Sequence, residues 1–262
     1  MTKNFIYYPR MSNICQINDF LKNILDPKEI NDVAINGIQI ENEGNIDKAS
    51  FAVDCSVSAI DKAASEGSRL LIVHHGIFWG KPVPIMSNHR IRIKKLLESN
   101  IGLIAYHLPL DCHDEYGNNI GILKKIGTSN NRSFGFYKGS KIGYAGDLEN
   151  PSDINDICSK LGIGIDEKTV RYLDFGRKDI TRIAVVSGGG GSCFDEAVRD
   201  GYDLFITGDA EHELYHPAKE NKINMLFAGH YFTETFGVKA LCELVRNKFG
   251  IQTLFHQIPT GL

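Results

Sequence analysis

Histidines fall at the ends of the apolar runs of this chain, at positions where a sheet would present them together. His74 and His75 end one run, His107 ends the next, and His230 ends a third. The carboxyl ends of parallel strands meet at one edge of an open sheet, and ligands of α/β proteins bind at that edge. The spacing therefore predicts a site that is built from imidazole groups at the ends of three strands.

Two of these histidines are followed by an acid four residues later. Asp111 follows His107, and Glu234 follows His230. Residues four apart share one face of a helix, with about 5–6 Å between their Cβ atoms, so both side chains can reach the same ion or neighbouring ions. Imidazole and carboxylate together suit Zn, Fe, Mn, Co or Ni, and the absence of a Cys-x-x-Cys pair argues against a thiolate site.

The number of candidate ligands favours two ions over one. Five such ligands exceed the three that a single catalytic zinc usually takes from the protein. Two ions about 3.5–4 Å apart, bridged by a carboxylate and a water or hydroxide, would use five ligands and give a nucleophile at neutral pH. Ordinary core or surface histidines are the alternative, which we favour for His89, His113 and His256. The adjacent His74 and His75 fit that alternative less well, because two buried imidazoles need polar partners.

The elements that must position these residues alternate between helix and strand patterns, which is typical of an α/β protein. A helix over 12–25 comes first. A strand, a helix and a strand are then predicted over 50–56, 58–66 and 69–73, and a helix and a strand over 89–99 and 101–106. A similar strand, helix and strand follow over 182–186, 193–199 and 203–207, and the chain ends with a strand over 224–228, a helix over 233–248 and a strand over 252–256.

Composition changes in the middle of the chain, which indicates more than one domain. Residues 127–179 are rich in Gly, Ser, Asn and charged residues, with a short strand over 141–145 and a helix over 154–160. A chain of 262 residues can form two domains of ordinary size. We predict a discontinuous metal-site α/β domain over 1–125 plus 225–262 and a second α/β domain over 126–224.

Charge and hydropathy exclude several classes of partner. The chain has 29 Lys and Arg against 32 Asp and Glu, with 42% hydrophobic and 10% aromatic residues. This balance provides no excess of positive charge for nucleic acid or an anionic membrane. No apolar run approaches the roughly 20 residues of a membrane span, and the first ten residues lack the apolar centre of a secretion signal. Six cysteines without paired spacing fit a reducing compartment, so we expect a cytoplasmic protein.

Two polar segments have both a functional and a structural interpretation. The glycine run over 188–191 follows a strand and could hold a phosphate on its amides, but it lacks the complete G-x-G-x-x-G pattern and a Walker lysine. We favour the alternative that these glycines permit a tight turn and close packing. The acidic segment over 209–213, with His216, could form a metal-rich rim. An exposed, polar start of a helix explains it more simply.

Several short motifs occur in a fixed order along most of the chain. They are Asn36-Gly37-Ile38-Gln39-Ile40, Val73-His74-His75-Gly76-Ile77-Phe78-Trp79, Tyr106-His107-Leu108-Pro109-Leu110-Asp111, Gly117-Asn118-Asn119, Ser187-Gly188-Gly189-Gly190, Phe205-Ile206-Thr207-Gly208-Asp209, Ala228-Gly229-His230-Tyr231-Phe232-Thr233-Glu234 and Ile258-Pro259-Thr260-Gly261. Together these motifs resemble those of the GTP cyclohydrolase 1 type 2 homologue family, also called NGG-interacting-factor-like proteins. The length of the chain matches the compact form of that family, without an inserted middle domain.

The resemblance implies a fold, a metal site and an assembly. The fold is two similar α/β domains with mixed sheets covered by helices, and the assembly is a ring-shaped homohexamer. Two divalent ions per chain would be held by His74, His75, Asp111, His230 and Glu234. The resemblance also places His107 near the metals, where it would orient a ligand or contact substrate. Asp209 stands where relatives often have Glu.

The function that follows is that of a metal-dependent hydrolase acting on a small molecule, such as a nucleotide. A metal-bound hydroxide would attack the substrate, and Asp111 or Glu234 would bridge the metals and accept the proton, with His107 as a further catalytic residue. A metal carrier or sensor, or an adaptor that binds other proteins, would use the same ligands without turnover. A purely structural α/β ring is the third alternative.

Overall fold

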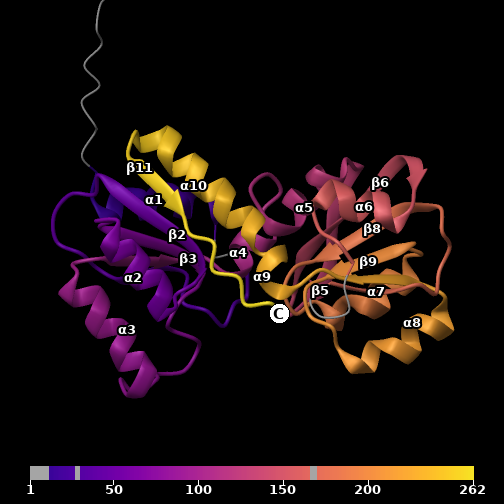
Figure 1. Cartoon of the computed structure of the whole chain (residues 1–262), viewed down its shortest axis with the longest axis horizontal. Coiled ribbons are helices and arrows are strands. Elements are labelled where there is room, and N and C mark those ends of the chain that lie inside the picture. Colours follow the sequence, from indigo (N-terminus) through magenta and orange to yellow (C-terminus); the bar gives the residue numbers. More distant parts are fainter. Residues whose placement is uncertain (1–11, 27–29, 166–169) are drawn as a thin grey trace, which may run out of the picture. The chain divides into compact units, whose positions relative to one another are not determined.

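The computed structural model describes residues 12–26, 30–165 and 170–262. These residues form two compact units, which are coloured along the chain in Figure 1. The first unit comprises 12–24, Val33–Tyr106 and Val238–Ile258, and the second comprises the described parts of Leu25–Asp32, His107–Gly237 and Pro259–Leu262. The predicted second domain over 126–224 falls inside the second unit, and its predicted boundaries stay a prediction. The first ten residues lie outside the described part.

The first unit is a five-stranded mixed sheet in the order β1-β4-β3-β2-β11. Its elements are α1 (Ile14–Leu25), β1 (Gly37–Ile40), β2 (Lys48–Asp54), α2 (Val57–Ser65), β3 (Leu70–His75), α3 (Ser87–Glu98), β4 (Gly102–Ala105), most of α10 (Thr235–Phe249) and β11 (Gln252–Phe255). The strands β2, β3, β4 and β11 are parallel, and β1 is antiparallel to β4. The predicted strand-helix-strand order over 50–73 is therefore confirmed.

Local sequence explains the elements that carry the first histidines. Ser56 caps α2, since its hydroxyl oxygen accepts a hydrogen bond from the amide of Ala59, and the helix buries Ala59, Ile60 and Ala63 against the sheet. The first five residues of β3 are all buried, as expected for a parallel strand that is covered on both faces. This strand ends in His74 and His75, so both imidazoles emerge at the carboxyl edge of the sheet.

The second unit is a six-stranded mixed sheet in the order β5-β6-β8-β9-β10-β7. Its elements are α4 (Leu108–Asp111), α5 (Asn118–Ile126), β5 (Ser129–Tyr137), β6 (Ser140–Ser152), α6 (Ile154–Leu161), β7 (Arg171–Leu173), β8 (Ile180–Val186), η2 (Gly191–Cys193), α7 (Phe194–Arg199), β9 (Leu204–Thr207), η3 (His212–Leu214), α8 (Tyr215–Asn221), β10 (Asn224–Phe227) and α9 (His230–Thr233). The strands β8, β9 and β10 are parallel, whereas β5, β6 and β7 join the sheet in antiparallel pairs.

The core of the second unit lies on both faces of this sheet. Along β8, Ile183 and Val185 belong to one buried apolar cluster, and Ala184 and Val186 belong to another. This alternation is the period-two pattern of a strand between two layers of helices. Both units are thus α/β layers with mixed sheets, as the sequence predicts.

One predicted helix differs in its start. The sequence predicts a continuous helix over 233–248, but the structure has the short α9 and then α10, with Glu234 between them at φ −100° and ψ 4°. The hydroxyl of Thr233 donates to the carbonyl oxygens of Gly229 and His230, so these bonds are made within the short helix α9. Glu234 consequently sits at a break between two helices.

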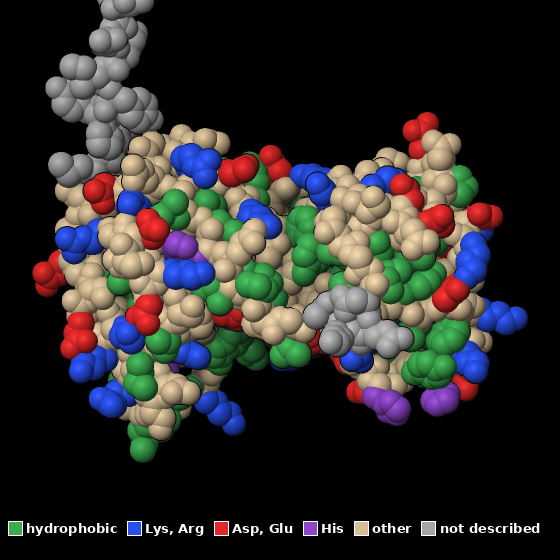
Figure 2. All heavy atoms as spheres, in the orientation of Figure 1, with side chains coloured by type: hydrophobic (Ala, Val, Ile, Leu, Met, Phe, Trp, Pro, Cys, Tyr) green, Lys and Arg blue, Asp and Glu red, His purple; other side chains and the backbone are tan. Residues whose placement is uncertain are grey.

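On the face shown in Figure 2, basic and acidic side chains are interspersed. Among the helices of the described ranges, none has the length and apolar character of a membrane span. All six cysteines are free thiols, and Cys15 is the exposed one.

Candidate metal centre

Six of the described side chains carry imidazole or carboxylate groups that could bind a metal ion. They are His74 and His75 in the first unit and His107, Asp111, His230 and Glu234 in the second. These are the residues that sequence spacing predicts.

In the first unit, the two adjacent histidines at the end of β3 are held by different acceptors. Nδ1 of His74 lies 3.0 Å from the carbonyl oxygen of Tyr106, and Nδ1 of His75 lies 2.9 Å from Oδ1 of Asp54. Their rings are 4.6 Å apart between centroids. His74 is fully buried. Because a carbonyl oxygen only accepts, Nδ1 of His74 must carry the proton, and the lone pair of the neutral ring lies on Nε2.

In the second unit, His107 is oriented by a buried carboxylate. Nδ1 of His107 lies 2.9 Å from Oδ1 of Asp32, whose side chain is 2% exposed. The other oxygen of Asp32 accepts a hydrogen bond from the amide of Leu108 at 3.0 Å. This pair of bonds fixes both the ring and the start of α4. The arrangement is the carboxylate–histidine pairing that orients metal-ligating or proton-transferring imidazoles.

Asp111 ends α4 and is buried in a network of amides. Its Oδ1 accepts hydrogen bonds from Nδ2 of Asn118 and from the hydroxyl of Ser187, both at 2.8 Å. The neighbouring Asn119 donates to the carbonyls of Asp111 and Ile142, and its own oxygen accepts from the amide of Ser187. Asn118 and Ser187 therefore hold one carboxylate in a single orientation, and Asn119 connects the main chains around it.

His230 and Glu234 form a close pair of candidate ligands within the second unit. Nε2 of His230 lies 3.1 Å from Oε1 of Glu234, and Nδ1 of His230 lies 3.0 Å from both carboxylate oxygens of Asp209. Glu234 first, and Asp209 in addition, raise the pKa of His230 to about 9 in the metal-free protein. Two ligands bonded to one ion at about 2.1 Å lie about 3 Å apart, so this spacing suits a shared metal.

The acids that orient three of these histidines are residues that sequence reasoning passes over or leaves open. Asp54 and Asp32 have no motif of their own, and Asp32 precedes its partner by 75 residues. Asp209 lies in the acidic segment that we interpret as a polar helix start, yet it contacts His230 directly. The others of that segment are more peripheral, since His212, Glu213 and His216 are exposed.

The glycine run over 188–191 is a tight turn that uses its amides internally. Gly188 donates to the hydroxyl of Thr233, and Gly190 donates to the hydroxyl of Thr207. Gly188 has φ +61°, and a Cβ atom there would lie 2.4 Å from Oε1 of Glu234. The run therefore permits the close approach of the turn to Glu234, which agrees with the structural interpretation rather than with a phosphate cradle.

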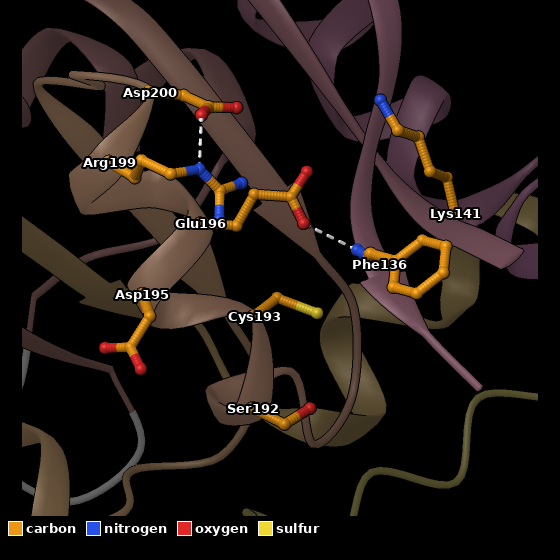
Figure 3. Close-up of a pocket in the computed structure, with 8 residues that line it drawn as sticks. All are labelled: Phe136, Lys141, Ser192, Cys193, Asp195, Glu196, Arg199 and Asp200. Carbon is orange, nitrogen blue, oxygen red and sulfur yellow. Dashed lines mark hydrogen bonds and ion pairs between the residues drawn. The ribbon is translucent and has the colours of Figure 1, made fainter. Parts of the chain in front are cut away.

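A pocket of about 500 Å³ lies farther along this segment (Figure 3). Ser192 and Cys193 line it together with Phe136, and Glu196 accepts a hydrogen bond from the amide of Phe136 at 2.7 Å. Arg199 pairs with the adjacent Asp200. Its lining includes none of the six candidate ligands, so this pocket is separate from them.

Comparison with known proteins gives the family. A model of the Duf34/NIF3 (NGG1p interacting factor 3) family matches residues 12–260. The chain belongs to this family. Relatives named GTP cyclohydrolase 1 type 2 homolog include one from Archaeoglobus fulgidus, 43% identical over 95% of this chain and 100% of the relative, and one from Pyrococcus abyssi, 42% identical over 94% and 98%.

Solved structures agree with the fold of this Duf34/NIF3 protein. Protein ybgI, described as of unknown function, has a TM-score of 0.87 at 31% identity, with 96% of this chain and 100% of that chain covered. TTHA1606 from Thermus thermophilus has a TM-score of 0.85 at 32% identity, with the same coverage. The predicted fold class is thus confirmed.

Proposed function

We propose that this Duf34/NIF3 protein is a metal-dependent hydrolase whose two divalent ions are held by His74, His75, Asp111, His230 and Glu234. The observation that carries the proposal is the pairing of His230 with Glu234 at 3.1 Å, with Asp209 on the opposite nitrogen of the ring. The carbonyl of Tyr106 and the carboxylate of Asp54 hold Nδ1 of the other two imidazoles in the same way. Imidazole and carboxylate donors fit Zn, Fe, Mn, Co or Ni.

When bound, the ions would lower the pKa of a water molecule to near neutrality and polarise the bond to be broken. The chain supplies the rest of the chemistry. Glu234 is a buried carboxylate at the break between α9 and α10, and Asp111 is fixed by two donors on one oxygen. Either acid accepts the proton of the attacking water. His107, oriented by Asp32, contacts the substrate or passes a proton to the leaving group.

The substrate class that we propose is a nucleotide or a related small molecule. Support comes from the relatives, which are named GTP cyclohydrolase 1 type 2 homolog. We also propose that the protein works in the cytoplasm as a ring-shaped homohexamer.

Elemental analysis of the purified protein, prepared without added metal or chelator, tests the metal centre. We expect about two ions per chain in the parent and in the control His216→Ala, which removes an exposed imidazole. The double variant His74→Ala/His230→Ala should lose most of its metal. Equal metal in this variant and the parent would overturn the ligand assignment.

Hydrolysis assays on a panel of nucleotides test catalysis in the same preparations. Asp111→Asn should keep the fold and lose activity by a factor of about 100 or more, because a general base contributes about 10²–10⁴ in rate. Two ions per chain with no turnover on any substrate would overturn the hydrolase and favour a metal carrier or sensor. Absence of metal would overturn both functions.

A further inference from the structure

The sequence motif over 36–40 holds the loop that follows β3 in the first unit. Oε1 of Gln39 accepts a hydrogen bond from the amide of Ile77 at 2.7 Å, and Nε2 of the same side chain donates to the carbonyl of Ile35 at 2.7 Å. Gln39 also fills the space beside Gly76, where a Cβ atom would lie 2.4 Å from the carboxamide. The loop is therefore clamped immediately after the strand that ends in the two histidines.

The indole of Trp79, at the end of this loop, is held in place and partly exposed. Its Nε1 donates to the carbonyl of Gly76 at 3.1 Å, and its main chain pairs with Ala34 in an isolated antiparallel bridge. Residues that oppose each other in such a pair place their side chains on the same face. The methyl group of Ala34 is small compared with an indole ring. Trp79 is half-buried, so part of its side chain reaches solvent.

The indole lies beside one of the candidate metal ligands. The rings of His75 and Trp79 are 5.9 Å apart between centroids, with an angle of 47° between their planes. This edge of the first unit is open to solvent, because the side chain of His75 is 18% exposed and that of Asp54 is 41% exposed. A molecule that binds at His75 therefore has an aromatic surface next to it.

We propose that Trp79 is a binding residue on which the base of a nucleotide stacks, beside His75. Aromatic side chains bind bases in this way with little dependence on which base is present, because every base has a π face. A ring that the fold already holds loses little entropy on binding. The inference rests on the proposed function and narrows it, since the substrate would carry a planar ring on the Trp79 side of the candidate metal centre. Gln39 acts only through the loop.

Fluorescence titration of the purified protein, as isolated, tests the stacking. Trp79 is the only tryptophan of the chain, so its emission reports directly on a ring that binds against it. The probes are the four common nucleoside monophosphates and ribose 5-phosphate, which has the sugar and the phosphate but no base. At least one nucleotide should quench the emission and bind about fivefold or more tightly than ribose 5-phosphate, as expected for one base–aromatic stack. Ribose 5-phosphate should leave the emission unchanged.

Calorimetry on variants separates stacking from a structural role. Trp79→Leu keeps an apolar side chain without a flat ring, so it should bind nucleotides about fivefold or more weakly and bind ribose 5-phosphate like the parent. Trp79→Phe keeps a flat ring and loses the bond to Gly76, so it should retain most of the affinity. Phe136→Leu is the matched control, because it removes an aromatic ring that is 63% exposed in the second unit, and it should bind like the parent.

Four results would overturn the stacking. They are a parent that binds none of the nucleotides, ribose 5-phosphate that binds as tightly as they do, Trp79→Leu with the affinity of the parent, and an equal loss in Trp79→Phe and Trp79→Leu. Metal content measured on each preparation separates this proposal from the metal centre. A metal-free parent whose nucleotide binding depends on Trp79 retains the stacking and refutes the metal centre, and a metal-loaded parent without that dependence does the reverse.

Discussion

Both carboxylate oxygens of Asp209 lie 3.0 Å from Nδ1 of His230. Asp209 thus fixes which nitrogen of the imidazole faces away from the candidate metal position and directs Nε2 toward Glu234. Asp54 and Asp32 do the same for His75 and His107. A carboxylate that is bonded to Nδ1 also raises the basicity of the imidazole. Such a carboxylate would therefore strengthen a bond from Nε2 to a metal ion in addition to orienting the ring.

Replacement of Asp209 by Asn should weaken metal binding without unfolding the protein. The amide keeps the size of the side chain but removes the charge that helps to hold His230, and loss of such a partner typically costs 10–100-fold in metal affinity. Competition with a chromophoric chelator measures the affinity. The control is Asp195→Asn, an exposed acid of the same unit. Parent-like affinity in Asp209→Asn would refute an orienting role.

Replacement of Gly188 by Ala should damage the site more than the fold. The new Cβ would lie 2.4 Å from Oε1 of Glu234 at a left-handed backbone position, so Glu234 must move. Gly162 is a matched control, because it has φ +78° and open space around the Cβ position. Both variants should lose roughly 1–2 kcal/mol of stability from backbone strain. Metal content should fall only in Gly188→Ala, and a similar fall in Gly162→Ala would contradict the steric argument.

Replacement of Asn119 by Ala should destabilise the second unit. This fully buried side chain bonds two carbonyls and one amide, and all three groups would lose their partner. We expect the free energy of unfolding to fall by about 3 kcal/mol in urea titrations, since each unsatisfied buried group costs about 1–3 kcal/mol. Asn221→Ala, at an exposed amide, should change it by less than about 0.5 kcal/mol. Comparable losses of unfolding free energy in the two variants would contradict the stabilising role of the Asn119 hydrogen bonds.

Acid stability should depend on the ion pair between β5 and β6. Arg132 contacts Asp147 through two nitrogens, at 3.0 and 3.1 Å, and lowers the pKa of that carboxyl below its usual 3.8. The pair stabilises the fold at pH values above 3.8, and the contribution disappears as the pH falls through the folded-state pKa. About a third of each side chain is exposed, so solvent screening limits the contribution to about 1 kcal/mol or less.

Asp147→Asn tests this dependence. The variant should be less stable than the parent at pH 7, and the difference should vanish near pH 2, as measured by thermal unfolding across pH. A difference that persists at pH 2 would show that packing, rather than charge, is lost.

Much of the fold follows from sequence pattern because buried parallel strands are continuous in apolar residues. The strand that ends at His75 and the strands that precede His107 and His230 are predicted for this reason. The β5–β6 hairpin is harder to predict, since Ser129–Tyr137 begins with five polar residues and is largely exposed. The turn between β5 and β6 nevertheless has a recognisable sequence. Lys138 and Gly139 both have positive φ, and this Lys-Gly pair forms the two-residue turn of the hairpin.

The candidate ligands could be predicted because strand ends and i, i+4 spacing are local features. Their orienting acids are not local. Asp32 reaches His107 across 75 residues, and Asp54 meets His75 only because β2 and β3 pair in parallel at their ends. Such partners depend on tertiary register, which no periodic pattern encodes. Asp209 is the intermediate case, because it follows a predicted strand by two residues yet resembles an ordinary surface acid.

The anchoring of each imidazole through Nδ1 has a consequence for how the proposed ions would bind and dissociate. Protein groups, rather than an ion, already restrict the rotamers of these rings, so their ordering entropy is lost during folding. In small zinc domains, by contrast, metal binding and folding are one event. Chelation should therefore leave this protein folded, and reloading should proceed at a rate set by ligand exchange instead of chain rearrangement.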